Sequence, residues 1–227
     1  PALPPDDGGY RLAWYAYGED YHTVMKDKLH ALLHYVATPL PGVSGRAFCD
    51  TAPLLERYWA WRGGLGWTGR NTQLIIPGAG SAFFLGELVI DRPLAYDTPQ
   101  RDRCGNCTRC LRACPTGALH APHRLDARRC LSYLTIEHRG PIPPEAAAHL
   151  SPCIYGCDRC QEACPWNRFA RLPPRPALLA MRRPDWEKLS PEDYRTLFKG
   201  SAVKRAKYEG LTRNIRCCST DTGKESS

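Results

Sequence analysis

The chain carries, at residues 104–115, the stretch CGNCTRCLRACP, which holds four cysteines and ends in a proline. The spacing C-x2-C-x2-C-x3-C-P is typical of bacterial ferredoxins, where three of the thiolates bind one 4Fe–4S cluster and the fourth binds a second cluster. A zinc site needs only two Cys-x-x-Cys pairs, so four closely spaced cysteines before a proline favour clusters over zinc. The stretch therefore predicts a module with two clusters.

A shorter motif follows at residues 156–165, GCDRCQEACP, which holds three more cysteines before Pro165. Two clusters need four thiolates each, and the two motifs together are one thiolate short. If the motifs are related by pseudo-symmetry, the last cysteine of each binds the cluster of the other. The first predicted ligand set is then Cys104, Cys107, Cys110 and Cys164.

The second cluster lacks one ligand in this scheme. Its three ligands from the motifs would be Cys114, Cys157 and Cys160. The fourth is either Cys130, which would come from outside the repeat, or Cys153, which lies very close to the second motif. The spacing alone favours neither cysteine.

Composition limits the class of protein. The 227 residues include 43% hydrophobic residues and 12 cysteines, enough for a packed core and unlike a small secreted disulfide scaffold. No apolar run is long enough to span a membrane, and the first residues lack the layout of a secretory signal. We therefore expect a cytoplasmic protein without a membrane partner.

Hydrophobic periodicity up to about residue 97 predicts mixed helices and strands. We expect strands at 11–18, 45–51, 73–77 and 81–90, the last crossing the middle of a sheet. We expect helices at 19–36 and 53–61, the first with an apolar stripe formed by Val24, Met25, Leu29, Leu32, Leu33 and Val36.

Beyond the first motif, short helices are expected within 108–115, 143–150 and 159–165. Residues 169–184 are rich in proline and indicate a linker. A Ser-x-x-Asp pattern at Ser190 predicts the start of a helix. Residues 201–215 are predicted to form one amphipathic helix, and the tail from 216 on has no periodicity and indicates disorder.

The formal net charge is +8, which is compatible with a polyanionic partner. Basic residues gather in two segments, 101–139 and 199–216. Either segment could simply be a solvated face. The second segment is the better candidate for contacts with phosphates.

Seven sequence blocks, in order between about Gly18 and Ile215, resemble the epoxyqueuosine reductases, cobalamin-dependent iron–sulfur enzymes of queuosine biosynthesis in transfer RNA. The blocks are GEDYHTVMKDKL, FCDTAPLLERYWAWRGGLGWTGRNTQLI, SAFFLGEL, CGNCTRCLRACPTGAL, RRCLSYLTIE, IYGCDRCQEACPWNR and FKGSAVKRAKYEGLTRNI. The family is also similar to the reductive dehalogenases in pairing a corrinoid with two clusters. Compared with the family pattern, part of the N-terminal domain and most of the C-terminal helical repeats are missing.

The resemblance implies an α+β fold. It combines a partial mixed α/β cobalamin-binding domain (1–97), a bacterial ferredoxin-like module with two 4Fe–4S clusters (98–172), a linker with the start of a helical-repeat domain that binds transfer RNA (173–216), and a disordered tail (217–227). A monomer and an external low-potential electron donor are also implied.

The resemblance also implies a reaction, in which electrons pass through the clusters to cobalamin, in the cob(II)alamin form, and the epoxide of epoxyqueuosine is reduced. The family's RC-x-SYLTIE block carries a ligand, which favours Cys130 over Cys153. Its FVDT-type block, here FCDT, supplies a proton donor, and the matching residue is Asp50. Without the resemblance, Asp50 is better explained as the cap of the helix that follows it.

Further contacts are implied with less specific motifs. Cobalamin contacts are expected at Asp50, Asn71, Gln73 and Ser132, with Trp67 nearby. Contacts with transfer RNA phosphates are expected at Lys204, Arg205 and Lys207. Two other functions remain compatible with the motifs: a ferredoxin-type electron carrier, which leaves the first 97 residues unexplained, and a zinc-based nucleic-acid binder.

Overall fold

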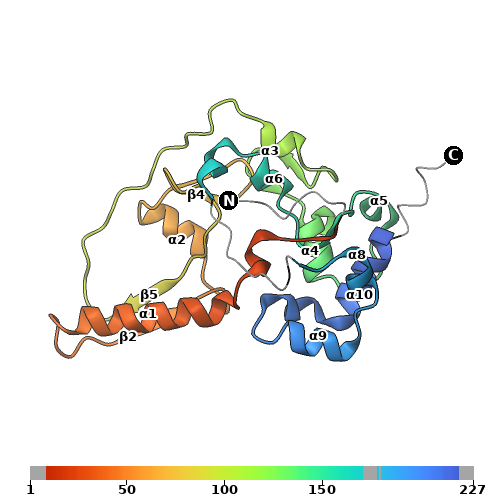
Figure 1. Ribbon diagram of the computed structural model, residues 1–227. Helices are drawn as coiled ribbons and strands as arrows, with labels where there is room; N and C mark the ends of the chain where they lie inside the picture. Colours follow the sequence, from red (N-terminus) through yellow and green to blue (C-terminus); the bar gives the residue numbers. More distant parts are fainter. Residues whose placement is uncertain (1–8, 171–177, 179, 220–227) are drawn as a thin grey trace.

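The computed structural model describes residues 9–170, 178 and 180–219. Four small two-stranded sheets and many short helices form the chain (Figure 1). The strands are β1 (Arg11–Leu12), β2 (Gly45–Phe48), β3 (Trp67–Thr68), β4 (Leu74–Ile75), β5 (Glu87–Ile90), β6 (Leu119–Ala121), β7 (Arg124–Leu125) and β8 (Cys153–Tyr155). Three pairs are antiparallel, and only the β1–β8 pair is parallel among the described strands.

Helices connect and cover these sheets. The α-helices are α1 (Tyr21–Ala37), α2 (Glu56–Arg62), α3 (Arg109–Arg112), α4 (Leu131–Ile136), α5 (Pro144–Ala147), α6 (Arg159–Glu162), α8 (Arg183–Glu187), α9 (Pro191–Leu197) and α10 (Lys207–Ser219). The 3-10 helices are η1 (Trp14–Tyr17), η2 (Ala127–Arg129), η3 (Pro165–Phe169) and η4 (Ala202–Ala206). No described helix is long and apolar enough to cross a bilayer.

The predicted helix at 19–36 is α1, and its first turn is capped by the Asp20 side chain, which accepts a hydrogen bond from the backbone of His22. The expected apolar stripe is only partly buried. Leu29 is buried beside the β2–β5 pair, whereas Leu32 is 46% exposed. A two-stranded sheet is too narrow to cover the whole face of a 17-residue helix.

Two predicted strands are mostly wrong. The strand expected at 11–18 is limited to β1, because its partner β8 is short and the chain then turns into η1. The strand expected at 81–90 is limited to β5, which pairs with β2 at the edge rather than the middle of a sheet. The first half of the segment 81–90 is held by tertiary contacts instead, since the Ser81 amide donates to Asn167 Oδ1 at 2.6 Å.

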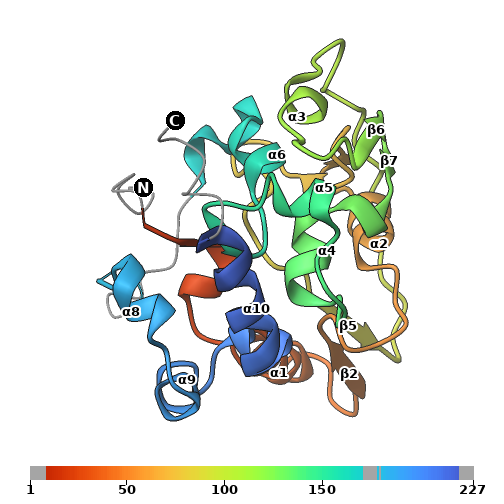
Figure 2. The same cartoon turned by 90° about the vertical axis from the view of Figure 1, so that its right-hand side faces the viewer.

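A hydrophobic core lies where β8, α4 and α10 meet, and Figure 2 shows α4 and α10 near each other. Ile154, Tyr155, Leu150 and Leu211 are fully buried there. The Asn214 side chain joins the three elements, because Nδ2 donates at 2.8 Å to the carbonyls of Thr135 and Ile154. The buried side-chain amide of Asn214 is tolerated because its Nδ2 group satisfies both buried carbonyls as hydrogen-bond acceptors.

The predicted start of α9 is confirmed. Ser190 Oγ accepts a hydrogen bond from the backbone of Asp193, and the Asp193 carboxylate accepts one from the backbone of Ser190, forming a capping box. The single helix predicted at 201–215 is wrong, because η4 and α10 are separated at Lys207, which has φ 61°. Arg139 donates to the carbonyls of Arg205 and Ala206 at this break.

The expected disorder from 217 on is wrong for the last described residues. Helix α10 continues to Ser219, since Cys218 is fully buried and Ser219 Oγ lies 2.7 Å from the Tyr10 hydroxyl. Residues 220–227, and residues 171–177 and 179 of the linker predicted at 169–184, lie outside the described residues.

Replacing Asn214 with alanine is expected to lower the free energy of unfolding by about 2–6 kcal/mol, because two buried carbonyls lose their donor at about 1–3 kcal/mol each. Urea denaturation of the anaerobic protein measures the change. Arg216→Ala, at an exposed position of the same helix, is the control and should change stability by less than about 0.5 kcal/mol. Equal stability of the two variants would contradict the bridging role of Asn214.

Candidate active site and cysteine cavities

The first predicted cysteine set lines one cavity. Its wall is formed by the turn after β3, the loop before α3, and the segment that follows α6. The lining residues are Arg70, Asn71, Ile75, Cys104, Cys107, Arg109, Cys110, Cys164, Pro165 and Trp166. The structure thus brings Cys164 to the three cysteines of the first motif.

The surroundings of this cavity suit a group that binds thiolates. Burial raises the pKa of Cys104, Cys110 and Cys164, so these thiols ionise only at a cost that a bound metal cluster would offset. The Trp67 indole donates to Cys104 Sγ at 3.4 Å. Asn71 is 3% exposed and its Nδ2 has no hydrogen-bond partner in the structure. A cluster sulfide would be a suitable acceptor for this amide, which fits a 4Fe–4S cluster.

The second set consists of Cys114, Cys130, Cys157 and Cys160. The Cys130 thiol lies within electrostatic range of Cys157 and Cys114, and the Cys160 thiol lies within range of Cys157, Cys130 and Cys114. Burial is the main cause that raises the pKa of Cys130 and of Cys160. In the described part of the chain, no three His, Cys, Asp or Glu side chains are placed to hold a single metal ion. The four thiols nevertheless lie near one another.

Cys153 has a different environment. It lies on β8, is buried, and its thiol is hydrogen-bonded to Cys157, while its carbonyl is 4.0 Å from Cys218 Sγ. No interaction with Cys114, Cys130 or Cys160 is among the main influences on its thiol. Cys130 as the fourth member of the second set stays a prediction, which its closeness to Cys114, Cys157 and Cys160 supports.

Asp50 lies on the loop between β2 and α2, with φ 58°. Its backbone amide donates to Glu56 Oε1, and its carboxylate Oδ2 accepts from the Tyr21 hydroxyl at 2.6 Å. His22 Nε2 lies 3.4 Å from the same oxygen. The Asp50 side chain is 59% exposed, so its carboxylate is held on one side and accessible on the other.

The predicted helix cap at Asp50 is wrong. Helix α2 begins only at Glu56, its N-cap is Leu55, and residues 51–54 form turns through hydrogen bonds of Thr51 and Leu54 with carbonyls two residues earlier. A capping role therefore does not explain Asp50, whose carboxylate contacts Tyr21 and His22 of α1 instead.

Asp50 borders a cavity of about 280 Å³, and most of the residues that line the cavity are aromatic or apolar. It is lined by Tyr15, Tyr21, Cys49, Asp50, Glu56, Arg57, Gln73, Leu74, Ser81, Phe83, Phe84 and Leu85. Tyr21 and Phe84 stack with ring centroids 4.1 Å apart and an interplanar angle of 5°. Such a lining fits one part of a flat apolar macrocycle, but the volume is below the usual 300–1,000 Å³ of ligand pockets, so a whole corrinoid would extend beyond it.

The predicted cofactor residues fall in different places. Gln73 lines the Asp50 cavity, whereas Asn71 lines the first cysteine cavity. The segment 71–75 contributes to both cavities, since Leu74 lines the Asp50 cavity and Ile75 lines the first cysteine cavity. Ser132 lies in the first turn of α4, and its backbone amide is hydrogen-bonded to the Cys130 thiol. The two cavities are therefore separated by a single short segment.

Sequence reasoning missed the carboxyl pair beneath the Asp50 loop. Burial, and then the nearby Glu56, raise the pKa of Glu87 on β5 to about 7. Glu56 itself holds the Asp50 amide. Tyr21, Glu56 and Arg57 stand in two of the sequence blocks that carry the family resemblance, but no local spacing distinguishes them from ordinary helix residues.

The predicted phosphate contacts are exposed. Lys204 and Arg205 lie on η4, and Lys207 begins α10. Arg205 forms an ion pair with Glu137 at 2.8 Å, and this contact raises the pKa of its guanidinium. The segment before η4 adjoins the start of α1, because the Asp20 amide donates to the Gly200 carbonyl at 2.9 Å, and Tyr21 in the first turn of α1 contacts Asp50.

Two family models match the chain. The model described as "4Fe-4S double cluster binding domain" covers residues 103–167, and the model described as "Epoxyqueuosine reductase QueG, DUF1730" covers residues 2–51. The first match includes both cysteine sets.

Curated relatives carry one name. An epoxyqueuosine reductase of Cellulophaga algicola is 44% identical over 215 residues, which are 92% of this chain and 70% of the relative. An epoxyqueuosine reductase of Escherichia coli is 42% identical over 213 residues, covering 91% of this chain and 56% of the relative.

Solved structures agree with these relatives. A crystal structure of an epoxyqueuosine reductase with an epoxyqueuosine-modified tRNA-Tyr stem loop matches with a TM-score of 0.88 and 29% identity. A Bacillus subtilis epoxyqueuosine reductase, solved with its catalytic aspartate loop swung out of the active site, matches with a TM-score of 0.87 and 28% identity. Both matches cover 100% of this chain but only 61% of the other chain, so this chain spans less than two thirds of their length.

Replacing Cys130 with serine is expected to remove one cluster, about half of the bound iron, because the second set then has three thiolates. Cys153→Ser is the matched control and should keep the iron content of the parent chain. Iron and acid-labile sulfide analysis after anaerobic reconstitution measures both. Loss of iron in Cys153→Ser together with full iron in Cys130→Ser would reverse the assignment.

Proposed function

Because the chain belongs to the epoxyqueuosine reductase family, we propose that it reduces epoxyqueuosine to queuosine in transfer RNA. The observation that carries the proposal is the placement of Asp50 in an aromatic cavity that one short segment separates from a cavity lined by four cysteines. An electron carrier alone would need the cysteine cavities but not the Asp50 cavity.

The reaction is a two-electron deoxygenation. Both carbon–oxygen bonds of the epoxide break, a carbon–carbon double bond forms, and the oxygen leaves as water after taking up two protons. The reduction therefore needs a source of two electrons and a proton donor beside the leaving oxygen.

We assign the electrons to bound cofactors. When bound, two 4Fe–4S clusters and cobalamin would supply the low-potential electrons for the reduction. The first cluster would be held by Cys104, Cys107, Cys110 and Cys164, and the second by Cys114, Cys130, Cys157 and Cys160. Gln73 and Asp50 border the cavity that would receive part of the corrinoid, Ser132 is a further candidate contact, and Asn71 is better placed to contact the first cluster.

Asp50 would deliver a proton to the oxygen that leaves. Its Oδ2 is oriented by the Tyr21 hydroxyl, which keeps the carboxyl group at the cavity wall. Aromatic side chains around it would exclude water once substrate covers the opening. His22, at 3.4 Å, is close enough to return a proton to Asp50 after each turnover.

The loop that carries Asp50 would close over the substrate. The Asp50 amide is held by the Glu56 side chain, and the Asp50 φ of 58° is a conformation that non-glycine residues adopt rarely. The related Bacillus subtilis enzyme, whose catalytic aspartate loop was seen swung out, supports a loop that moves.

Transfer RNA would bind across the side of the molecule that carries both Asp50 and η4. Lys204, Arg205 and Lys207 would contact phosphates, which gives affinity that decreases with salt but little sequence discrimination. The solved complex of a relative with a modified tRNA stem loop supports this class of substrate. The modified base would have to leave its stack to reach the cavity.

Replacing Asp50 with asparagine is expected to slow single-turnover conversion of epoxyqueuosine by about 10²–10⁴-fold, because the amide cannot donate an acidic proton. The assay uses the anaerobically reconstituted chain and an epoxyqueuosine-containing tRNA stem loop, with the product identified by mass spectrometry. Absorbance spectra should show unchanged cluster and cobalamin bands.

Asp27→Asn, at an exposed position of α1, is the matched control and should convert substrate at the rate of the parent chain. Undiminished conversion by Asp50→Asn would remove Asp50 from the mechanism. Failure of the parent chain to convert substrate while it retains all cofactors would reject the proposed activity.

A further inference from the structure

The arginines of segment 101–139 have no assigned role in the proposed reaction, although the segment also carries cysteines of both sets. The structure uses some of its arginines internally: Arg128 pairs with Asp126 at 2.9 Å, and Arg139 binds the carbonyls at the η4–α10 break. The guanidinium groups of Arg101, Arg109 and Arg112 make no hydrogen bond or ion pair with the described residues, and all three side chains are exposed.

These arginines surround the loop that carries the first cysteine set. Arg101 and Arg103 precede Cys104, and Arg109 and Arg112 are the two ends of α3, next to the third cysteine of that set. Residues 105–106, between the first two cysteines, are exposed. Arg103 lies over the ring of Trp67, whose indole donates to Cys104 Sγ. Positive charge therefore borders the part of the first cavity that is nearest to solvent.

Nearby acidic groups do not cancel this charge. Asp102 Oδ1 accepts a hydrogen bond from the Cys104 amide at 2.7 Å, and Asp102 Oδ2 is 3.8 Å from His123. Asp126 is paired with Arg128. The exposed charge that remains around the cysteine loop is positive, and a partner that fits it must be acidic.

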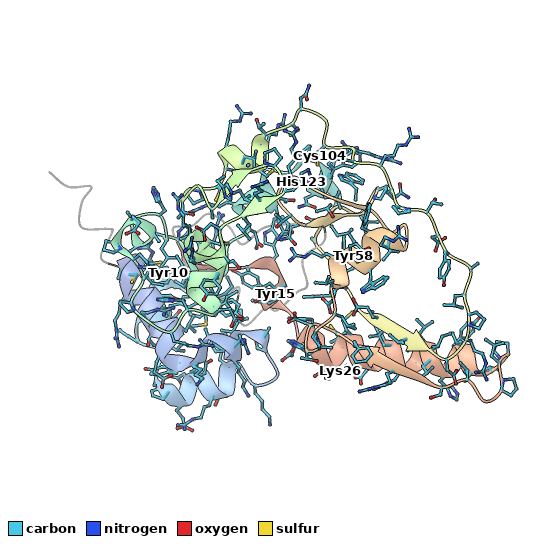
Figure 3. The ribbon with its side chains drawn as sticks, turned by 180° about the vertical axis from the view of Figure 1, so that it is seen from behind. Tyr10, Tyr15, Lys26, Tyr58, Cys104 and His123 are labelled. Carbon is cyan, nitrogen blue, oxygen red and sulfur yellow. The ribbon has the colours of Figure 1, made fainter. Side chains whose placement is uncertain are left out.

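The arginine face lies at the end of the molecule opposite the candidate RNA contacts. In Figure 1, α3 is at the top, while α9 and α10, which flank η4, are at the lower right. Figure 3 shows Cys104 and His123 at the top edge, with Tyr15 of the Asp50 cavity between them and Lys26. An RNA held at η4 and Asp50 therefore leaves the arginine face uncovered, which favours a second, different partner.

We propose that Arg101, Arg103, Arg109 and Arg112 form the docking face for an acidic, low-potential one-electron carrier protein that reduces the cluster held by the first cysteine set. The inference rests on the proposed function, because the deoxygenation consumes two electrons that the chain does not generate. Each encounter oxidises one carrier by one electron and reduces the cluster by one electron, so two encounters supply one turnover. The carrier supplies electrons only, and the two protons that the deoxygenation takes up have another source.

The chemistry of the face predicts how docking behaves. Exposed charges act mainly by steering the partner, so the association rate should rise at low salt and fall as screening increases. Guanidinium groups are well suited to this role, because they stay charged and bind carboxylates in a bidentate manner. The short distance between the exposed loop and the cysteine cavity places the carrier beside the group it reduces.

The test uses the anaerobically reconstituted chain and an acidic plant-type 2Fe–2S ferredoxin, a carrier with a potential of about −400 mV. Binding is measured by titration at about 50 mM and about 200 mM salt. The variant R101E/R112E is expected to bind the ferredoxin about tenfold more weakly than the parent chain at the lower salt concentration, and to be reduced by it more slowly by a similar factor. Its iron content, and its reduction by a neutral small-molecule mediator, should not change.

The control K28E/K188E changes net charge equally at exposed positions of α1 and at the end of α8. It should change ferredoxin affinity by less than about twofold.

Three results would overturn the proposal. They are equal affinity of R101E/R112E and the parent chain, equal losses of affinity in R101E/R112E and K28E/K188E, and binding by the parent chain that does not depend on salt. Loss of affinity for the tRNA stem loop in R101E/R112E, with ferredoxin binding intact, would show that the face binds RNA instead. A chain that binds ferredoxin through these arginines but does not convert epoxyqueuosine would reject the proposed function and keep the docking face.

Discussion

The structure depends on the convergence of cysteine thiols from separate segments. Cys104, Cys107 and Cys110 meet Cys164 across about fifty residues of chain, and Cys114 faces the second set, so the two motifs exchange their last cysteines. This exchange joins α3 to α6. The thiols are buried enough to resist ionisation in the absence of metal, so bound clusters would stabilise this half of the molecule as well as carry electrons.

The proposed chemistry follows from what lies next to these cavities. The segment 71–75 forms a wall of both the first cysteine cavity and the Asp50 cavity, so an electron-transfer site and a proton donor share one short piece of backbone. The carboxylate of Asp50 is supplied from a loop rather than from a helix or strand, which allows it to approach a substrate as large as a tRNA loop. Substrate and electron carrier would then use opposite ends of the molecule.

Sequence reasoning reached the parts of the structure that local spacing determines. The cysteine spacing placed seven thiols in two groups, and the capping pattern at Ser190 placed the start of α9. Sequence reasoning failed where contacts between distant residues determine the local structure. The predicted strand at 81–90 does not begin at Ser81, because the Ser81 amide donates to Asn167 instead of to a neighbouring strand. The choice of Cys130 needed the family resemblance, and the Tyr21 contact that orients Asp50 needed the structure, because neither has a distinctive spacing.

The most direct test of the central claim is the iron content of the chain after anaerobic reconstitution and removal of unbound metal. Two 4Fe–4S clusters predict about eight iron atoms and about eight sulfides per chain, with absorbance typical of cubane clusters. About four irons would mean that one of the two cysteine sets does not hold a cluster. A colourless protein with one or two zinc ions would contradict the account as a whole.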